Sequence, residues 1–217
     1  MNAGILTRHK LPAELGGITA VVFDIGGVLV TEKPDFAAMA HAMGLSTDAA
    51  SVRAFVAAFW KHRDEYDRAL PDDQYWRLVA RDAGAPALST AVVRELVDMD
   101  CQCWVRVEED ILALLRTLAD RGYALGILSN APSALPPLYR SWQWARLFRA
   151  MVFSSEVGMA KPDPHIYAYT AEMMRAAPEQ ILFFDDRQEN VSAARQSGLH
   201  AYVWEGVAQV HALLNLP

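Results

Sequence analysis

Five short apolar runs constrain the fold of this 217-residue chain more than any other feature. They are residues 18–23 (ITAVVF), 123–128 (YALGIL), 150–153 (AMVF), 181–184 (ILFF) and 200–204 (HAYVW). Continuous apolar runs of this length, bounded by polar residues, are typical of strands buried on both faces of a parallel sheet. Helical patterns at 107–121, 163–175 and 189–197 alternate with them. This alternation predicts an α/β fold built on a Rossmann-like, doubly wound parallel sheet.

The interval between the first two runs breaks this rhythm. About 75 residues there contain no convincing strand, and 36–43, 47–67, 72–82 and 89–99 have helical patterns instead. A crossover between parallel strands needs only about a dozen residues. We therefore predict a core of residues 18–32 and 107–217, an inserted helical cap of residues 33–106 and an N-terminal tail of residues 1–17.

Composition narrows the class of protein. With 53% apolar and 21% charged residues, a disordered chain is excluded. The net charge of −6 argues against a nucleic-acid partner, and no apolar run approaches the roughly 18 residues of a membrane span. Cys101 and Cys103 are too close together to join distant segments and too few for a zinc site. We expect a cytoplasmic protein, monomer or homodimer, without membrane or nucleic-acid partners.

Polar side chains follow the predicted strands at one edge of the sheet. These residues are Asp24, Ser129, Asn130, Ser154, Ser155, Asp185 and Asp186, with Lys161 shortly after the third strand. Ligands of open α/β sheets bind at this edge. Carboxylates that meet there repel one another unless a cation lies between them, and Mg²⁺ favours such oxygen ligands. The set suits phosphoryl transfer, in which an aspartate can also act as a covalent nucleophile.

Four segments in order resemble the motifs of the haloacid dehalogenase-like (HAD) hydrolases. They are FDIGGVLV (23–30), LSNA (128–131), GMAKPDPHIY (158–167) and FFDDRQENVSAAR (183–195). The resemblance covers residues 18–204, with the helical insertion in the place of the family's C1 cap. DRALPDDQYW (67–76) and Trp104 make the chain look closest to the sugar-phosphate phosphatases and the N-terminal phosphatase domain of soluble epoxide hydrolases.

The resemblance implies a metal site for Mg²⁺ beside a nucleophile. Asp24 would attack phosphorus to form an aspartyl-phosphate, and its other carboxylate oxygen would bind the ion. The backbone carbonyl of Gly26 and the carboxylate of Asp186 would also be metal ligands. Asp185 would hold the metal through water or orient Lys161.

The resemblance also implies a phosphate site. The Ser129 hydroxyl and the Asn130 backbone N–H would bind phosphoryl oxygens. Lys161 would neutralise charge on Asp24 and on the phosphate. Gly27 would provide the tight turn that lets the backbone approach the phosphate.

Position 26 departs from the family pattern. Most family phosphatases have Asp-x-Asp, and the second aspartate is the general acid and base, but this chain has Gly26. Losing acid–base help typically costs about 10²–10⁴ in rate. Either water or a cap residue substitutes, or the leaving group needs little help, or the protein is a weak catalyst.

These motifs predict a Mg²⁺-dependent phosphatase acting on a small phosphorylated metabolite, for example a sugar phosphate. One alternative is a metal-free 2-haloacid dehalogenase, against which the paired carboxylates count. Another is a HAD-fold binding protein with weak catalysis. His62, Arg63 and Tyr66 share one predicted cap helix, where they either pack or contact substrate. Trp60 and Trp104 are expected in the core or at the cap interface.

Overall fold

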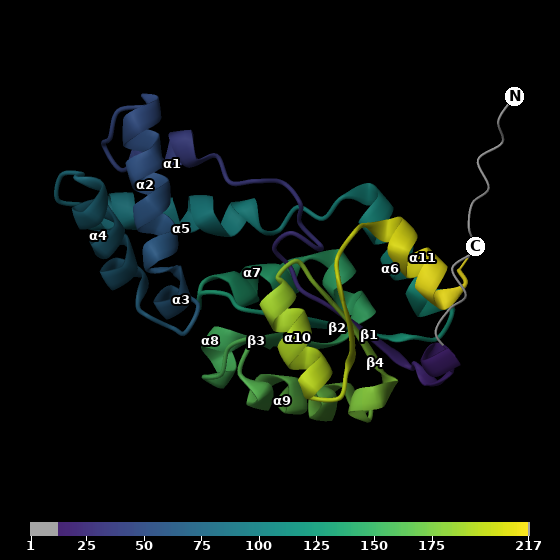
Figure 1. Cartoon of the computed structure of the whole chain (residues 1–217). Coiled ribbons are helices and arrows are strands. Elements are labelled where there is room, and N and C mark those ends of the chain that lie inside the picture. Colours follow the sequence, from purple (N-terminus) through teal and green to yellow (C-terminus); the bar gives the residue numbers. More distant parts are fainter. Residues whose placement is uncertain (1–12, 217) are drawn as a thin grey trace, which may run out of the picture.

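The computed structural model describes residues 13–216, and a five-stranded parallel sheet lies at its centre (Figure 1). The strand order is β3-β2-β1-β4-β5. The strands are β1 Ala20–Phe23, β2 Ala124–Ser129, β3 Phe148–Phe153, β4 Ile181–Asp185 and β5 His200–Val203. All five predicted strands are confirmed. β3 begins two residues earlier than predicted because exposed Arg149, which bonds to the Met174 carbonyl oxygen at 3.1 Å, interrupts the apolar run.

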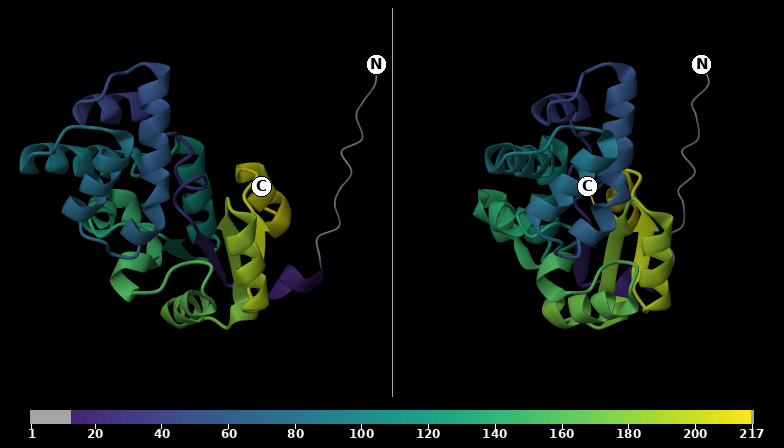
Figure 2. Two further views of the ribbon diagram at one scale, coloured as in Figure 1. Left: turned by 60° about the vertical axis from the view of Figure 1, so that its left-hand side comes forward. Right: turned by 90° about the vertical axis from the view of Figure 1, so that its left-hand side faces the viewer.

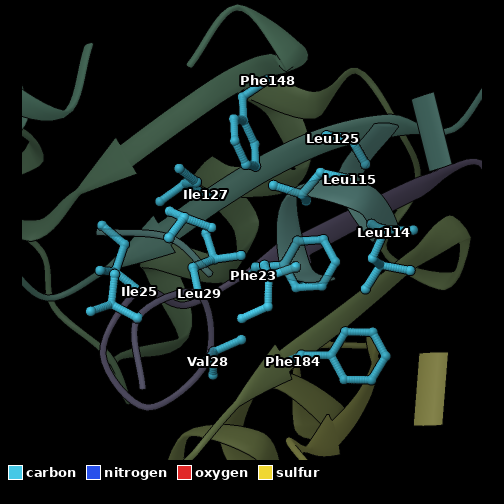
Figure 3. Packing of buried hydrophobic residues seen from close by; sticks show 14 of the residues in the cluster. Phe23, Ile25, Val28, Leu29, Leu114, Leu115, Leu125, Ile127, Phe148 and Phe184 are labelled. Atoms are coloured by element: carbon cyan, nitrogen blue, oxygen red, sulfur yellow. The ribbon is translucent and has the colours of Figure 1, made fainter. Parts of the chain in front are cut away.

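Helices cover both faces of the sheet. α6 Glu109–Asp120, α7 Leu135–Ser141 and α11 Val207–Leu214 pack on one face, and α9 Pro164–Met174 and α10 Gln188–Gln196 pack on the other. Because side chains of a strand alternate between faces, Phe23 joins the first layer and Val22 the second. Figure 3 shows Phe23 and Phe184 packed with Leu114 and Leu115 of α6 in this core.

Short helical segments complete the core. They are α8 Ser154–Val157 and the 3₁₀ helices η1 Ala13–Gly17, η2 Gln143–Leu147 and η3 Pro178–Gln180. Residues 13–17, predicted to belong to a tail, instead form η1, and Leu15 packs into the core because its apolar side chain leaves water there. Residues 1–12 of the predicted tail lie outside the described residues.

The inserted helices have a hydrophobic core of their own. They are α1 Phe36–Ala42, α2 Ala49–Lys61, α3 Arg63–Tyr66, α4 Asp72–Ala83 and α5 Thr90–Cys103. Phe55, Phe59, Tyr75 and Trp76 are fully buried between them. Figures 1 and 2 show this helical body beside the sheet, connected to it through the segments after β1 and before α6. The α/β fold with an inserted helical cap is confirmed, whereas the cap limits 33–106 and the core limits 18–32 and 107–217 stay predictions.

Two predicted cap helices have different bounds in the structure. The segment 47–67 is not one helix, since the chain turns at His62 (φ −108°, ψ 4°) between α2 and α3. This turn buries Arg63 against Asp67 and Asp100, a tertiary interaction that helical periodicity does not report. α5 continues four residues beyond the predicted 99, and Cys101 is buried there. Across residues 13–216, every helix is too short or too polar to cross a membrane.

Candidate active site

Strand pairing brings the acidic residues of the first and fourth motifs together. Phe23 of β1 is in register with Phe184 of β4, and the Asp24 N–H donates to the Phe184 carbonyl oxygen at 2.9 Å. Asp24, which follows β1, and Asp185, the last residue of β4, therefore lie side by side at the ends of neighbouring strands. Carboxylate oxygens of Asp24, Asp185 and Asp186 lie within 4.8 Å of one another.

Lys161 occupies the space between two of these carboxylates. Its Nζ lies 2.9 Å from Asp24 Oδ1 and 2.6 Å from Asp185 Oδ2, and the side chain is buried. Burial opposes the charge of Lys161, but the two carboxylates outweigh it, and the pKa of the ammonium is raised. Burial raises the pKa of the Asp24 carboxyl, Lys161 opposes this shift, and the charge of Asp185 adds to it.

The two adjacent aspartates of the fourth motif have different environments. Asp185 is fully buried, and its Oδ1 accepts hydrogen bonds from the Arg187 backbone N–H and from Asn190 Nδ2, both at 2.9 Å. With Lys161 on Oδ2, Asp185 is held rigidly as the partner of that ammonium. Asp186 is exposed and lines the cavity above the sheet edge.

Asn130 clamps the backbone of Lys161. Its Nδ2 donates to the Lys161 carbonyl oxygen and its Oδ1 accepts from the Lys161 N–H, both at 2.9 Å. Sequence reasoning considered only the backbone N–H of Asn130 and missed this role of its side chain. Ser129, the last residue of β2, is buried and lines the same cavity.

The two glycines after Asp24 have different neighbours. Gly27 has φ +73°, and a Cβ there would lie 2.7 Å from Asp186 Oδ2, so only glycine leaves room for that carboxylate. A Cβ at Gly26 would lie 3.3 Å from Cζ3 of Trp104. The position at which most family phosphatases have an acid therefore faces a tryptophan ring.

The donor set fits a hard divalent cation. Carboxylate oxygens of three aspartates lie within 4.8 Å of one another, the group contains no soft ligand, and Gly27 leaves space beside Asp186. Mg²⁺ prefers one or two carboxylates together with other oxygen atoms.

A cavity of about 770 Å³ separates the sheet edge from the cap. Residues of the sheet edge that line it are Asp24, Gly26, Gly27, Ser129, Asn130, Lys161, Asp186 and Asn190. Cap residues Phe36, Trp60, Arg63, Asp64 and Asp67 also line it. The sequence-predicted site residues thus converge on one cavity, except that Asp185 lies behind Lys161.

The cap side of the cavity contains a buried ionic network. Arg63 Nε donates to Asp67 Oδ1 at 2.8 Å, and Arg63 Nη1 donates to both carboxylate oxygens of Asp100 at 2.9 Å. Trp104 Nε1 donates to Asp100 Oδ1 at 3.0 Å. Sequence reasoning singled out Arg63 and Trp104 but missed Asp67 and Asp100, although the i,i+4 spacing of Arg63 and Asp67 is a usable signal.

The other cap residues singled out from the sequence differ in position. Tyr66 is buried in the cap core, and His62 bonds to Asp82 at 2.9 Å. Trp60 is 49% exposed and lines the cavity, so it belongs to the cavity wall rather than to a core.

Comparison with known proteins places these features in a family. The sequence pattern of the haloacid dehalogenase-like hydrolases matches residues 18–198. A sesquiterpene phosphatase of Aspergillus oryzae is 28% identical over 184 residues, covering 83% of this chain and 86% of its own. A phosphorylated carbohydrates phosphatase of Thermotoga maritima is 25% identical over 198 residues, covering 83% and 82%.

A solved structure has the same fold. It is a HAD family enzyme of Bacteroides thetaiotaomicron in complex with magnesium and inorganic phosphate. Its TM-score is 0.64 at 19% identity, over 86% of this chain and 94% of that one. Because the family pattern spans most of the sequence and the fold agrees with it, the chain belongs to the haloacid dehalogenase-like hydrolases.

Proposed function

We propose that this protein is a Mg²⁺-dependent phosphatase that hydrolyses a small phosphomonoester through an aspartyl-phosphate. The observation that carries the proposal is the buried Lys161 ammonium bonded to both Asp24 and Asp185, with Asp186 beside them. The phosphatase names of the two relatives support this chemistry. The magnesium and phosphate in the Bacteroides enzyme support the choice of ion.

The ion would be held by one carboxylate oxygen of Asp24, the Asp186 carboxylate and the Gly26 carbonyl oxygen. When bound, Mg²⁺ supplies positive charge that stabilises the phosphoryl oxygens in the transition state. Lys161 adds a second positive charge, which reduces the repulsion between the Asp24 carboxylate and an incoming phosphate. Asp185 keeps Lys161 in place.

The reaction then has two displacement steps. In the first, an Asp24 carboxylate oxygen attacks phosphorus, and the bond from phosphorus to the leaving oxygen breaks. The leaving oxygen keeps the bonding electrons and takes a proton. In the second, a water molecule loses a proton and attacks phosphorus, and the bond to Asp24 breaks to release phosphate. The Ser129 hydroxyl and the Asn130 N–H hold the phosphoryl oxygens in both steps.

The size of the cavity limits the substrate. A volume of about 770 Å³ lies within the range of sites for small molecules. Phe36 and Trp60 give its cap side aromatic surface, whereas Arg63 and Asp64 give it polar groups. A sugar phosphate is therefore one candidate, and a phosphate ester with an apolar leaving group is another.

Phosphate release tests the proposal. The protein should hydrolyse p-nitrophenyl phosphate and at least one member of a phosphometabolite panel, and EDTA should abolish this activity. Asp24→Asn should reduce turnover to background because an amide oxygen is a poor nucleophile, whereas Asp120→Asn, on the exposed end of α6, should retain it. Full activity of Asp24→Asn would exclude the aspartyl-phosphate route.

The other outcomes identify the alternatives. Tight binding of phosphate analogues without turnover would indicate a binding protein. Halide release from 2-haloacids without metal would indicate a dehalogenase.

A further inference from the structure

The sheet edge of the active site lacks a proton donor for the leaving group. Gly26 has no side chain, and a Cβ there would lie 3.3 Å from the Trp104 ring. Lys161 is bonded to both Asp24 and Asp185, so these three charges are engaged in positioning the nucleophile. The missing acid must therefore come from water or from another residue that lines the cavity.

Within residues 13–216, five acidic residues line the cavity, and they have different environments. They are Asp24, Glu32, Asp64, Asp67 and Asp186. Asp24 and Asp186 belong to the nucleophile and metal site. Glu32 is exposed and paired with Arg106 at 3.6 Å, and Asp64 is exposed. Asp67 is the one buried carboxyl that remains.

Asp67 is connected to the second motif through the Ser154 hydroxyl. Its backbone carbonyl oxygen accepts a hydrogen bond from the Ser154 hydroxyl. The same hydroxyl oxygen accepts from the N–H of Ala131, the residue after Asn130, at 2.9 Å. This bridge holds a cap residue beside the second motif, and Asp67 and Asp24 line the same cavity.

The side chain of Asp67 is oriented by the cap. Its Oδ1 accepts a hydrogen bond from Arg63 Nε at 2.8 Å. A carboxyl group has a second oxygen, which can carry a proton and donate it. Arg63 is itself fixed by Asp100 and stacks over the rings of Phe59 and Trp104.

The surroundings of Asp67 favour its protonated form. Burial raises the pKa of the Asp67 carboxyl to about 6, Arg63 opposes this shift, and the charges of Asp100 and Asp64 add to it. From the core, the uncharged Ser154 hydroxyl donates to the Asp67 carbonyl oxygen. An acid of this strength can both give and accept a proton near neutral pH.

We infer that Asp67 of the cap is the general acid and base of the phosphatase reaction, in place of the side chain that Gly26 lacks. This inference rests on the proposed function. In the first step, the Asp67 carboxyl O–H gives its proton to the leaving oxygen as the bond to phosphorus breaks. In the second step, the Asp67 carboxylate takes a proton from the attacking water, which returns Asp67 to its starting state.

The dependence of rate on the leaving group tests this role. Phenyl phosphate releases a strongly basic oxygen that needs a proton, whereas 2,4-dinitrophenyl phosphate releases one that does not. In Asp67→Asn, the ratio of kcat/KM for phenyl phosphate to kcat/KM for the dinitrophenyl ester should fall by about 10²-fold or more. An unchanged ratio in folded Asp67→Asn would overturn the inference.

The second step gives an independent readout. Without the base, Asp67→Asn should release a burst of about one dinitrophenolate per enzyme and then turn over slowly, because the aspartyl-phosphate accumulates. In the unsubstituted protein, kcat/KM for phenyl phosphate should decline above pH 6, and kcat/KM for the dinitrophenyl ester should not share this decline. This pH comparison needs no variant, so the absence of a decline specific to phenyl phosphate would overturn the inference even if Asp67→Asn folds poorly.

Two control variants separate catalysis from structure. Asp64→Asn removes an exposed carboxyl from the same cavity, and because Asp64 contributes least to the raised pKa of Asp67, it should change the leaving-group ratio little. Asp100→Asn removes the other anchor of Arg63 and one of the charges that raise the pKa of Asp67, so it should lower the leaving-group ratio much less than Asp67→Asn does. A fall of the ratio in Asp100→Asn equal to that in Asp67→Asn would assign the effect to Arg63 and overturn the inference. If the unsubstituted protein releases no phosphate from either ester with Mg²⁺, the proposed function itself is wrong, and the inference about Asp67 falls with it.

Discussion

At the scale of single residues, the environment decides what identical side chains do. Asp185 and Asp186 are adjacent in sequence, yet one is buried on Lys161 and the other is exposed to the cavity. Asp67 differs from both, because it is buried and its cationic partner Arg63 is shared with Asp100. The charge of Arg63 does not fully offset the burial of Asp67, so its pKa is raised and the stability of the protein should depend on pH.

We predict that the effect of Asp67→Asn on stability depends on pH. The pKa of Asp67 is about 6 in the folded protein against an ordinary value of 3.8, so the folded state binds the proton more tightly. This contribution to stability is complete below pH 3.8 and is lost as the pH rises through 6. The variant has no such loss, so its unfolding free energy relative to the unsubstituted protein should rise by up to about 3 kcal/mol between pH 4 and 7.

Urea unfolding at several pH values measures this difference. Asp120→Asn, an exposed carboxyl on α6, controls for the loss of one negative charge. A difference between variant and unsubstituted protein that stays constant from pH 4 to 7 would contradict the prediction.

At the scale of elements, close packing restricts which residues the strands can use. β2 passes beneath α9, and Met174 of α9 and Val22 of β1 are both fully buried there. A Cβ on Gly126 would lie 2.5 Å from Met174 Sδ and 3.1 Å from Val22 Cγ2. Glycine in this interior strand therefore permits the approach of the helix.

Gly126→Ala should destabilise the protein by about 1–3 kcal/mol, because the added methyl group overpacks the core. In the Gly126→Ala variant, Met174→Ala should lower the free energy of unfolding by less than it does in the unsubstituted protein, since the added methyl group fills part of the space that Met174 leaves. Chemical unfolding of the two single variants and the double variant measures this coupling. Gly17→Ala, with no atom within 4 Å of the added Cβ, is the control and should change stability little.

At the scale of the whole molecule, the active site is divided between the sheet edge and the cap. The Ser154 hydroxyl bridges the two bodies by accepting from the Ala131 N–H and donating to the Asp67 carbonyl oxygen. The cavity lies along the same boundary. The position of the cap therefore determines both the size of the cavity and the position of Asp67.

Ser154→Ala should weaken this boundary. It leaves a buried N–H and a buried carbonyl without their shared partner, which costs roughly 1–3 kcal/mol. Hydrogen exchange of the Ala131 amide should accelerate, and KM for the phosphate ester should rise. Ser155→Ala is the matched control, since the Ser155 hydroxyl has no hydrogen-bond partner within residues 13–216 and should cost little. Equal effects of the two variants would show that the bridge is not specific.

Much of the fold and the sheet-edge side of the candidate site could be predicted from local sequence. Buried parallel strands have continuous apolar runs, and the polar residues at their carboxyl ends must meet at one edge, which is why Asp24, Ser129, Lys161 and Asp186 could be grouped. Their catalytic roles stay predictions. The break at His62 could not be predicted, because the ion pairs that bury Arg63 depend on another helix.

The sequence by itself determined the order along the chain of the five strands and of three core helices, and the edge at which polar residues gather, because these follow from residue type and periodicity. The resemblance to the family motif identified Gly26 as the position without an acid, whereas α7 and α11 were not predicted. Only the tertiary structure decided which cap residues reach that edge. Arg63 and Asp100 are 37 residues apart in sequence, and Ser154 and Asp67 are 87 apart. Periodicity reports which face of an element is buried but not which element packs against it, so only the folded chain shows that Asp67 and Asp24 line one cavity.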